Sequence, residues 1–230
     1  MQPPTRHFAI IAFRKAGRMR FLSHLDLAGV IERAVRRAGL PVKYSEGYNP
    51  SPQIGYASAL PVGTAGEREL AQIELERTVP ADELLRRLSK QLPDELAVVE
   101  ADVVSGQKKR HVSGRERAHY DIELHPQAVD SQLLERAVAR VMDDAGTLVI
   151  VRETKSRIRE IDIRPGIFEV DVLTPGHDDA GARLRMTLAL QQQSLVKPSE
   201  VLEVIERALA DVTGREHALQ VRQITRLAIS

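Results

Sequence analysis

Apolar and polar residues change their spacing in the same order twice along the chain of 230 residues. Short apolar runs and strict alternation predict strands, whereas apolar residues three and four apart predict helices. In the first half these patterns predict a strand at 7–13, a helix between Ser23 and Gly39, a strand within 41–59, a strand at 70–79, a helix from Pro80 to Pro93 and a strand at 96–104. In the second half they predict a strand at 119–124, a helix at 126–145, strands at 147–152 and 183–190, a helix at 198–212 and a strand at 217–229.

Each half therefore has the order β-α-β-β-α-β, which predicts an α+β protein of two tandem ferredoxin-like (split β-α-β) units with antiparallel sheets. The stretch SGQKKRHVSGRER is poor in apolar residues and contains Gly and Ser, as linkers do. We expect an N-terminal ferredoxin-like domain at 1–104, a basic linker at 105–117 and a C-terminal ferredoxin-like domain at 118–230.

The composition excludes several chemistries. The chain has no cysteine, which excludes disulfides, thiolate zinc sites, iron–sulfur clusters and thiol nucleophiles. The histidines form no i, i+4 pair, and the phosphate-binding glycine motifs are absent, so we expect no metal, no cofactor and no autonomous enzyme. There is no apolar run of about 18 residues and no signal-peptide pattern, so we expect a cytoplasmic protein without a membrane partner.

The charge is balanced in total but divided along the chain. Against 33 Lys and Arg stand 32 Asp and Glu. Residues 1–50 and 105–118 are net basic, whereas 51–104 and 119–150 are net acidic. Such blocks can build a basic face for a nucleic acid on a nearly neutral protein. The alternative is that basic and acidic segments pair with one another at the surface.

The stretch KYSEGYNPSP at 43–52 is the first candidate site. It contains two of the four tyrosines of the chain, next to Lys43 and among turn-forming residues. Bases of single-stranded RNA stack on aromatic rings while cations meet phosphate, so Lys43, Tyr44, Tyr48 and Asn49 are candidate RNA-binding residues. The alternative is that both tyrosines cover the core.

Further basic residues surround this stretch. Arg18 and Arg20 follow the first strand near Gly17, where a turn would expose them. Arg14 and Lys15 lie beside them, and Arg33, Arg36 and Arg37 occupy the polar face of the first helix. The alternative for the helix arginines is a solvated face whose aliphatic stems cover the core.

The stretch RETKSRIREIDIRP at 152–165 is a second candidate RNA contact, through Lys155, Arg157, Arg159 and Arg164. The alternative is a solvated hairpin in which Arg164 pairs with Asp162.

Ser23, His24 and Asp26 combine a hydroxyl, an imidazole and a carboxylate at a helix start. These types are typical of N-caps and first turns, so we expect a structural role. His24 is kept as a candidate phosphate partner or general base.

The run from Arg20 to Gly63, RFLSHLDLAGVIERAVRRAGLPVKYSEGYNPSPQIGYASALPVG, resembles the radical SAM-linked protein family. The resemblance continues through GEREL at 66–70, REIDIRP at 159–165 and SLVKPSEVLEVI at 194–205. Family members look like extensions of cobalamin-type radical SAM proteins or free-standing proteins encoded near ribonuclease E/G and ribosomal protein genes. The resemblance implies no catalytic residues. It makes the following matched positions candidates for a shared surface: Arg20, His24, Tyr44, Tyr48, Asn49 and Arg164.

The sequence thus predicts a non-catalytic RNA-binding module that acts on tRNA or rRNA in RNA processing or modification. One alternative is a protein-interaction subunit that docks a ribonuclease or a radical SAM enzyme. Another is a metal-independent RNA endonuclease, for which His24 is the lone candidate.

Overall fold

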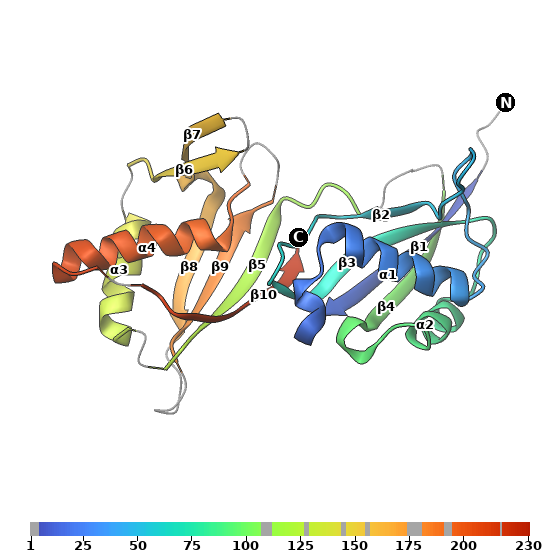
Figure 1. The fold of residues 1–230 in the computed structure, drawn as a ribbon, viewed down its shortest axis with the longest axis horizontal. Helices are drawn as coiled ribbons and strands as arrows, with labels where there is room; N and C mark the ends of the chain where they lie inside the picture. The colour runs from blue at the N-terminus through green and yellow to red at the C-terminus, as the bar shows by residue number, and fades with distance from the viewer. Residues whose placement is uncertain are drawn as a thin grey trace. The chain divides into compact units, whose positions relative to one another are not determined.

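The computed structural model describes residues 5–106, 112–126, 129–143, 146–154, 157–173, 181–190, 195–216 and 218–230. The chain divides into two compact units, the N-terminal unit Met1–Arg115 and the C-terminal unit Glu116–Ser230. Within the described residues it is a mixed α+β fold with four α-helices, whose elements are labelled in Figure 1. None of the described helices is long and apolar enough to cross a membrane.

The N-terminal unit consists of a sheet covered by two helices. In chain order its elements are β1 (Arg6–Lys15), the 3-10 helix η1 (Gly17–Phe21), α1 (His24–Arg37), β2 (Ile54–Tyr56), β3 (Ala65–Leu75), α2 (Ala81–Ser89), η2 (Asp94–Leu96) and β4 (Val98–Gly106). Strand β1 lies between β4 and β3, and β2 pairs with β3, all antiparallel. The register places Ile11 opposite both Ala71 and Ala101.

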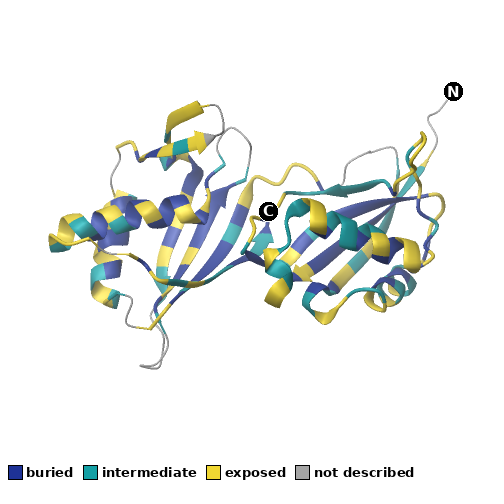
Figure 2. Ribbon diagram, in the orientation of Figure 1, coloured by how far each residue is buried: buried dark blue, intermediate teal, exposed yellow. Residues whose placement is uncertain are grey.

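Helix α1 begins and ends where its local chemistry predicts. The Ser23 Oγ accepts a hydrogen bond from the backbone N–H of Asp26, which caps the first turn. Gly39 follows the helix with a φ of +59°, a conformation that side chains other than glycine rarely adopt. The buried face of α1 (Leu27, Ile31, Ala34 and Val35) joins one core with the sheet and α2, which Figure 2 shows as dark-blue positions on the strands and inner helix faces.

The second face of this sheet is more closed than alternation predicts. The alternation of polar and apolar residues along β3 predicts that Gln72 and Glu74 face solvent, but both are buried. Phe8 on the neighbouring strand is also buried, beneath the guanidinium of Arg6 at 5.3 Å. The backbone N–H of Val112 donates to the side chain of Gln72, so a segment after β4 covers part of this face.

The C-terminal unit has a four-stranded sheet, two helices and a separate hairpin. In chain order its elements are β5 (Arg117–Leu124), α3 (Ser131–Asp143), β6 (Val149–Thr154), β7 (Arg157–Asp162), the 3-10 helix η3 (Arg164–Gly166), β8 (Ile167–Leu173), β9 (Arg183–Ala189), α4 (Pro198–Thr213) and β10 (Val221–Ile229). Its sheet has the order β10-β5-β9-β8 with antiparallel pairs.

The prediction for the second half missed two strands, β7 and β8, and placed a third in the wrong sheet. The strand expected at 147–152 exists as β6, but it pairs with β7 in a two-stranded sheet of its own. The strand beside β9 is β8, which the pattern analysis missed although Val170 and Val172 alternate with Glu169 and Asp171. Period-two alternation identifies a strand but not the strand with which it pairs. The pattern therefore did not show that β6 pairs with β7 and that β8 lies beside β9.

Candidate nucleic-acid interface

Residues 43–53 form a two-stranded extension between α1 and β2, which we call the arm. The backbone N–H of Gln53 donates to the carbonyl of Lys43 at 2.9 Å, and that of Ser45 donates to the carbonyl of Ser51 at 2.8 Å. Two further bonds of 2.9 Å join both strands of the arm to the backbone of Glu74 on β3. The arm is therefore an ordered continuation of the sheet edge.

The tip of the arm presents an aromatic ring to solvent. Tyr48 is fully exposed, at 103% of its reference area, and Asn49 beside it is exposed. Tyr44 is 36% exposed, with the guanidinium of Arg36 over its ring at 5.1 Å. The same Arg36 donates to the carbonyl of Pro50 at 3.1 Å. Neither tyrosine is buried in the core, and α1 holds the arm in place through Arg36.

Lys43 at the base of the arm is half-exposed and forms an ion pair with the buried carboxylate of Glu74. Its ammonium lies 3.1 Å from the Glu74 carboxylate, which also accepts two hydrogen bonds from the guanidinium of Arg6. Burial by itself would raise the pKa of the Glu74 carboxyl, but the hydrogen bonds from Arg6 and Lys43 outweigh it, and the pKa lies below its ordinary value. Lys43 therefore fastens the arm to β3.

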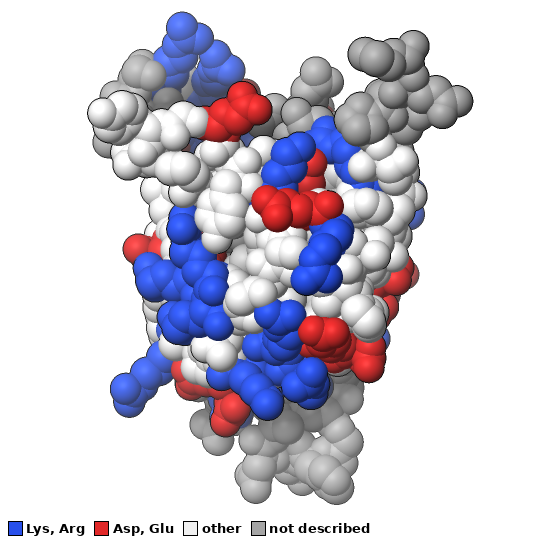
Figure 3. Space-filling view, turned by 90° about the vertical axis from the view of Figure 1, so that its right-hand side faces the viewer, with Lys and Arg blue, Asp and Glu red and all other residues white. Residues whose placement is uncertain are grey.

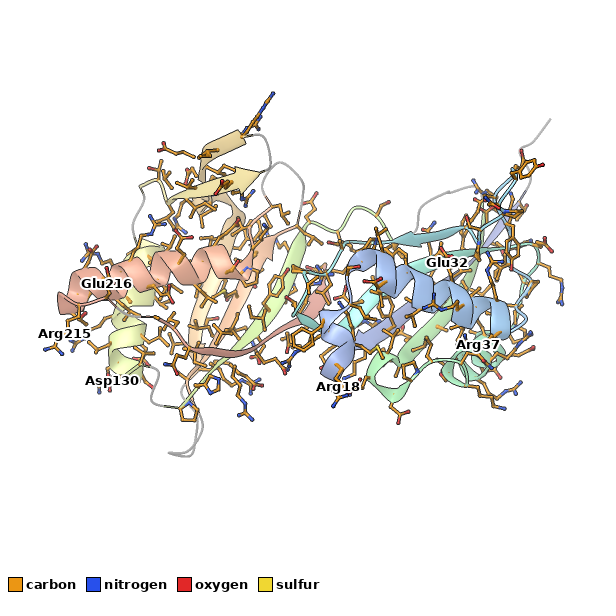
Figure 4. All side chains as sticks on the ribbon, in the orientation of Figure 1. Arg18, Glu32, Arg37, Asp130, Arg215 and Glu216 are labelled. Atoms are coloured by element: carbon orange, nitrogen blue, oxygen red, sulfur yellow. The ribbon has the colours of Figure 1, made fainter. Side chains whose placement is uncertain are left out.

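Cationic side chains gather around the C-terminal half of α1. Arg33, Arg36 and Arg37 are exposed there, and Figure 4 labels Arg37 near the end of the helix. The Arg37 guanidinium donates to the side chain and the carbonyl of Gln91. Figure 3 shows Lys and Arg gathered on this side of the N-terminal unit, with acidic side chains between them. The arginines near the arm can meet phosphate while Tyr48 meets a base.

The arginines of η1 lie at the opposite end of α1, about 20 Å away along a helix of 14 residues. Arg18 is exposed, and the guanidinium of Arg20 lies over the exposed ring of Phe21 at 4.7 Å. Two neighbours expected as phosphate ligands are engaged. Lys15 is buried and donates to the carbonyl of Leu22, and Arg14 pairs with Glu67 at 3.1 Å.

Ser23, His24 and Asp26 at the start of α1 have structural contacts, and Ser23 caps the helix. The Ser23 hydroxyl donates to the Asp26 carboxylate at 2.6 Å, whereas the ring of His24 packs edge-on against Tyr56 at 5.0 Å. Burial, with a smaller contribution from the charge of Glu32, raises the pKa of the Tyr56 hydroxyl. The Ser23 hydroxyl therefore donates to the Asp26 carboxylate, while the His24 imidazole packs against Tyr56. Among the described residues, no group of three His, Asp or Glu side chains is placed to hold a metal ion.

The second candidate stretch lies in the C-terminal unit. Arg157 and Arg159 are exposed on β7, and Lys155 lies outside the described residues. The guanidinium of Arg164 donates to the carbonyl of Met142 at 2.7 Å, in the last turn of α3. The Asp162 carboxylate accepts from the backbone N–H of Arg164. Arg164 therefore caps α3.

Of the predicted site residues, the structure brings Tyr44, Tyr48 and Asn49 together on one arm beside Arg36. Sequence reasoning missed that Arg36 positions the arm, because the contact joins residues up to 14 positions apart across a loop. It also missed the pairing of Arg152 with Glu200, at 2.7 Å, which ties the β6–β7 hairpin to α4.

Comparisons with known proteins identify a family. A family model described as an uncharacterised protein conserved in bacteria (DUF2344) matches residues 9–198. A search of curated proteins finds no match.

Two solved structures resemble the chain weakly. A chain in a crystal structure of a Cbf5-Nop10-Gar1 complex is 12% identical with a TM-score of 0.45, and the match covers 96% of this chain and 48% of that one. A putative chlorite dismutase, TA0507, is 11% identical with a TM-score of 0.27, over 98% of this chain and 95% of the other. Both TM-scores lie below 0.5, so neither likeness bears on function.

Proposed function

This chain belongs to the DUF2344 family of uncharacterised proteins conserved in bacteria, and we propose that it is a non-catalytic RNA-binding module. The observation that supports this function best is the fully exposed ring of Tyr48 at the tip of an ordered arm, beside the exposed arginines of α1. At this exposure the Tyr48 ring contributes no buried apolar area to the core. A ring held out in this way offers a stacking surface for an unpaired base.

The arm and α1 supply the two contributions to binding a single strand, which are base stacking and phosphate neutralisation. Base stacking on an aromatic ring contributes about 1–3 kcal/mol per base and tolerates any sequence. Each phosphate that an arginine neutralises releases counterions, which makes affinity fall with salt. Arg33 and Arg37 are the phosphate ligands in this proposal, and Arg36 holds Tyr44 and the arm in position.

The arm, and not the sheet face, is the RNA-binding surface of the N-terminal unit in this proposal. The open face of a ferredoxin-like sheet is a familiar RNA platform, where exposed aromatic residues stack on bases. Here the aromatic residue on that face, Phe8, is buried, and its neighbours Gln72 and Glu74 are buried as well.

We also propose that both units are ferredoxin-like, joined by the basic linker at 105–117, in which Lys108, Lys109 and Arg110 lie outside the described residues. Strand orders β4-β1-β3 with β2 on β3, and β10-β5-β9-β8, support this assignment. Arg18, Arg20 and His24 form a second group of candidate contacts, and Lys155, Arg157 and Arg159 a third.

The ligand in this proposal is a tRNA or rRNA in the cytoplasm. A cysteine-free chain suits a reducing compartment but does not require one. The resemblance to the radical SAM-linked family suggests that a ribonuclease or a radical SAM enzyme acts on the same RNA.

The test is binding of fluorescein-labelled tRNA and rRNA fragments, followed by anisotropy at about 50 and 200 mM salt. We expect Tyr48→Ala to weaken binding about 5- to 150-fold, the equivalent of one stacked base, and Tyr48→Phe to bind as the wild type does. Arg33→Ala should weaken binding and lower its salt dependence. The control Arg215→Ala, an exposed arginine of the C-terminal unit, should change neither (Figure 4).

Absence of binding at the lower salt would refute the proposal. Equal affinity of Tyr48→Ala and the wild type would refute the role of the arm.

A further inference from the structure

The inner face of the β6–β7 hairpin contacts the body of its unit near Ile150 and Arg152, and its outer face lies in solvent. Towards the turn of the hairpin, Arg157 and Arg159 of the inner set are exposed as well. On the inner face, Ile150 is 2% exposed, and Arg152 pairs with Glu200 of α4. On the outer face, three aliphatic side chains are exposed: Val149 at 39%, Val151 at 60% and Ile158 at 71%. Exposed aliphatic residues gathered on one face mark an interaction surface more often than residues scattered singly.

Carboxylates alternate with these aliphatic side chains. The register places Glu160 opposite Val151 and Glu153 opposite Ile158, and both glutamates are exposed. Directly opposite residues of an antiparallel pair lie on the same face. The outer face therefore carries aliphatic and acidic side chains side by side, whereas Arg157 and Arg159 belong to the inner set with Arg152.

We propose that this outer face docks a segment of a partner protein that presents aliphatic side chains together with Lys or Arg. Charge complementarity selects the occupant. On the outer face, the exposed carboxylates Glu153 and Glu160 repel phosphates and attract a basic protein segment. The candidate RNA contacts Arg157 and Arg159 belong to the other face of the hairpin by register. This surface is separate in sequence and in charge from the arm, and the inference does not depend on the RNA proposal.

A groove beside the hairpin extends the docking surface. Val149 also lines a cavity of about 420 Å³ between α3 and α4, together with Leu148, Val204 and Ala208. The ion pair of Arg140 and Asp211, at 3.3 Å, lies at the same groove. A concave, partly apolar pocket next to an exposed strand is suited to receive one anchoring side chain of the partner.

The test uses three short fluorescein-labelled peptides of alternating residues: lysine with isoleucine, glutamate with isoleucine, and lysine with serine. We expect the wild-type protein to bind the lysine–isoleucine peptide at least about tenfold more tightly than either of the others, a difference of about 1.4 kcal/mol. The double variant Val151→Ser, Ile158→Ser should lose this binding. The control Val99→Ser, which changes an exposed valine of the N-terminal unit, should retain it.

The charge reversal Glu153→Lys, Glu160→Lys should invert the preference, so that the glutamate–isoleucine peptide binds more tightly. Urea unfolding midpoints equal to that of the wild type verify that each variant is folded. Equal binding of all three peptides, or unchanged binding by the serine variant, would overturn the proposal. Parallel loss of RNA binding in the serine variant would also overturn it, because the face would then belong to an RNA interface.

Discussion

Neutralising Glu74 should destabilise the protein far more than neutralising a glutamate in an exposed ion pair. The Glu74 side chain is 4% exposed, and its carboxylate accepts hydrogen bonds from Arg6 and Lys43. In Glu74→Gln the side chain keeps its volume but loses its charge, so both cations face an amide. Glu67→Gln is the matched control, since Glu67 pairs with Arg14 and both side chains are more than 40% exposed.

The expected magnitude follows from how the cations can respond. Removing one partner of a fully buried ion pair costs about 3–5 kcal/mol, because the other charge stays buried without compensation. Here the side chains of Arg6 and Lys43 are 24% and 49% exposed, so each can turn partly towards water. We therefore expect a loss of about 1–3 kcal/mol in the free energy of unfolding for Glu74→Gln, and at most about 0.5 kcal/mol for Glu67→Gln.

The loss should depend on pH with a definite sign. The folded protein holds the pKa of Glu74 below its ordinary value, which is about 4.3 in the unfolded chain. A lowered pKa contributes stability that is complete above the unfolded value and disappears as the pH falls through the folded value. The difference between the wild type and Glu74→Gln should thus be constant from about pH 7 to pH 5 and shrink below about pH 4.

Urea unfolding of the three proteins, followed by circular dichroism at several pH values, measures these differences. Glu74→Gln as stable as the wild type at neutral pH would refute the assignment of Glu74 as the anchor of the arm. A difference that stays unchanged in acid would refute its ionisation as the cause.

Two further predictions concern a closely packed glycine and a helix cap. Gly181→Ala should lower the free energy of unfolding by at least about 2 kcal/mol in thermal or urea denaturation, because a Cβ there would lie 2.0 Å from the carbonyl oxygen of Leu124. The control Gly106→Ala, with open space around it, should lower the free energy of unfolding far less. Ser23→Ala should cost about 1 kcal/mol through loss of the cap on the Asp26 N–H, and Ser23→Thr, which keeps a hydroxyl that accepts from this N–H and donates to the Asp26 carboxylate, should restore most of it. Equal stability of the wild type and Ser23→Ala would contradict the capping role.

Local signals were sufficient for the ends of α1 and α4, whereas α3 begins at Ser131, five residues after the predicted start. The cap at Ser23 and the turn at Gly39 delimit α1, and Pro198 and Gly214 delimit α4, each within one or two residues of the expected ends. These features depend on short-range hydrogen bonds and backbone conformation, which the sequence contains directly.

Features that depend on contacts between residues distant in the chain could not be predicted from local sequence signals. Strand β6 has the alternation of a sheet strand, but its partner is its neighbour β7, and only tertiary packing decides that. The sequence leaves Arg164 open between an RNA contact and a partner of Asp162, yet its guanidinium donates to the carbonyl of Met142, 22 residues earlier. A charge pattern gives the number of cations and leaves open which of them already have a partner.

The attachment of the arm bears on the rate at which the proposed RNA would bind. Hydrogen bonds to Glu74 hold both strands of the arm, and Arg36 braces its tip from α1, so the Tyr48 ring is presented before any ligand arrives. Binding then requires no slow rearrangement of this loop, and encounter should proceed at the rate usual for docking preformed surfaces, about 10⁵–10⁷ M⁻¹ s⁻¹, or faster with electrostatic steering. Differences in affinity between RNA sequences would accordingly arise in the dissociation step, through the residence time of the stacked base.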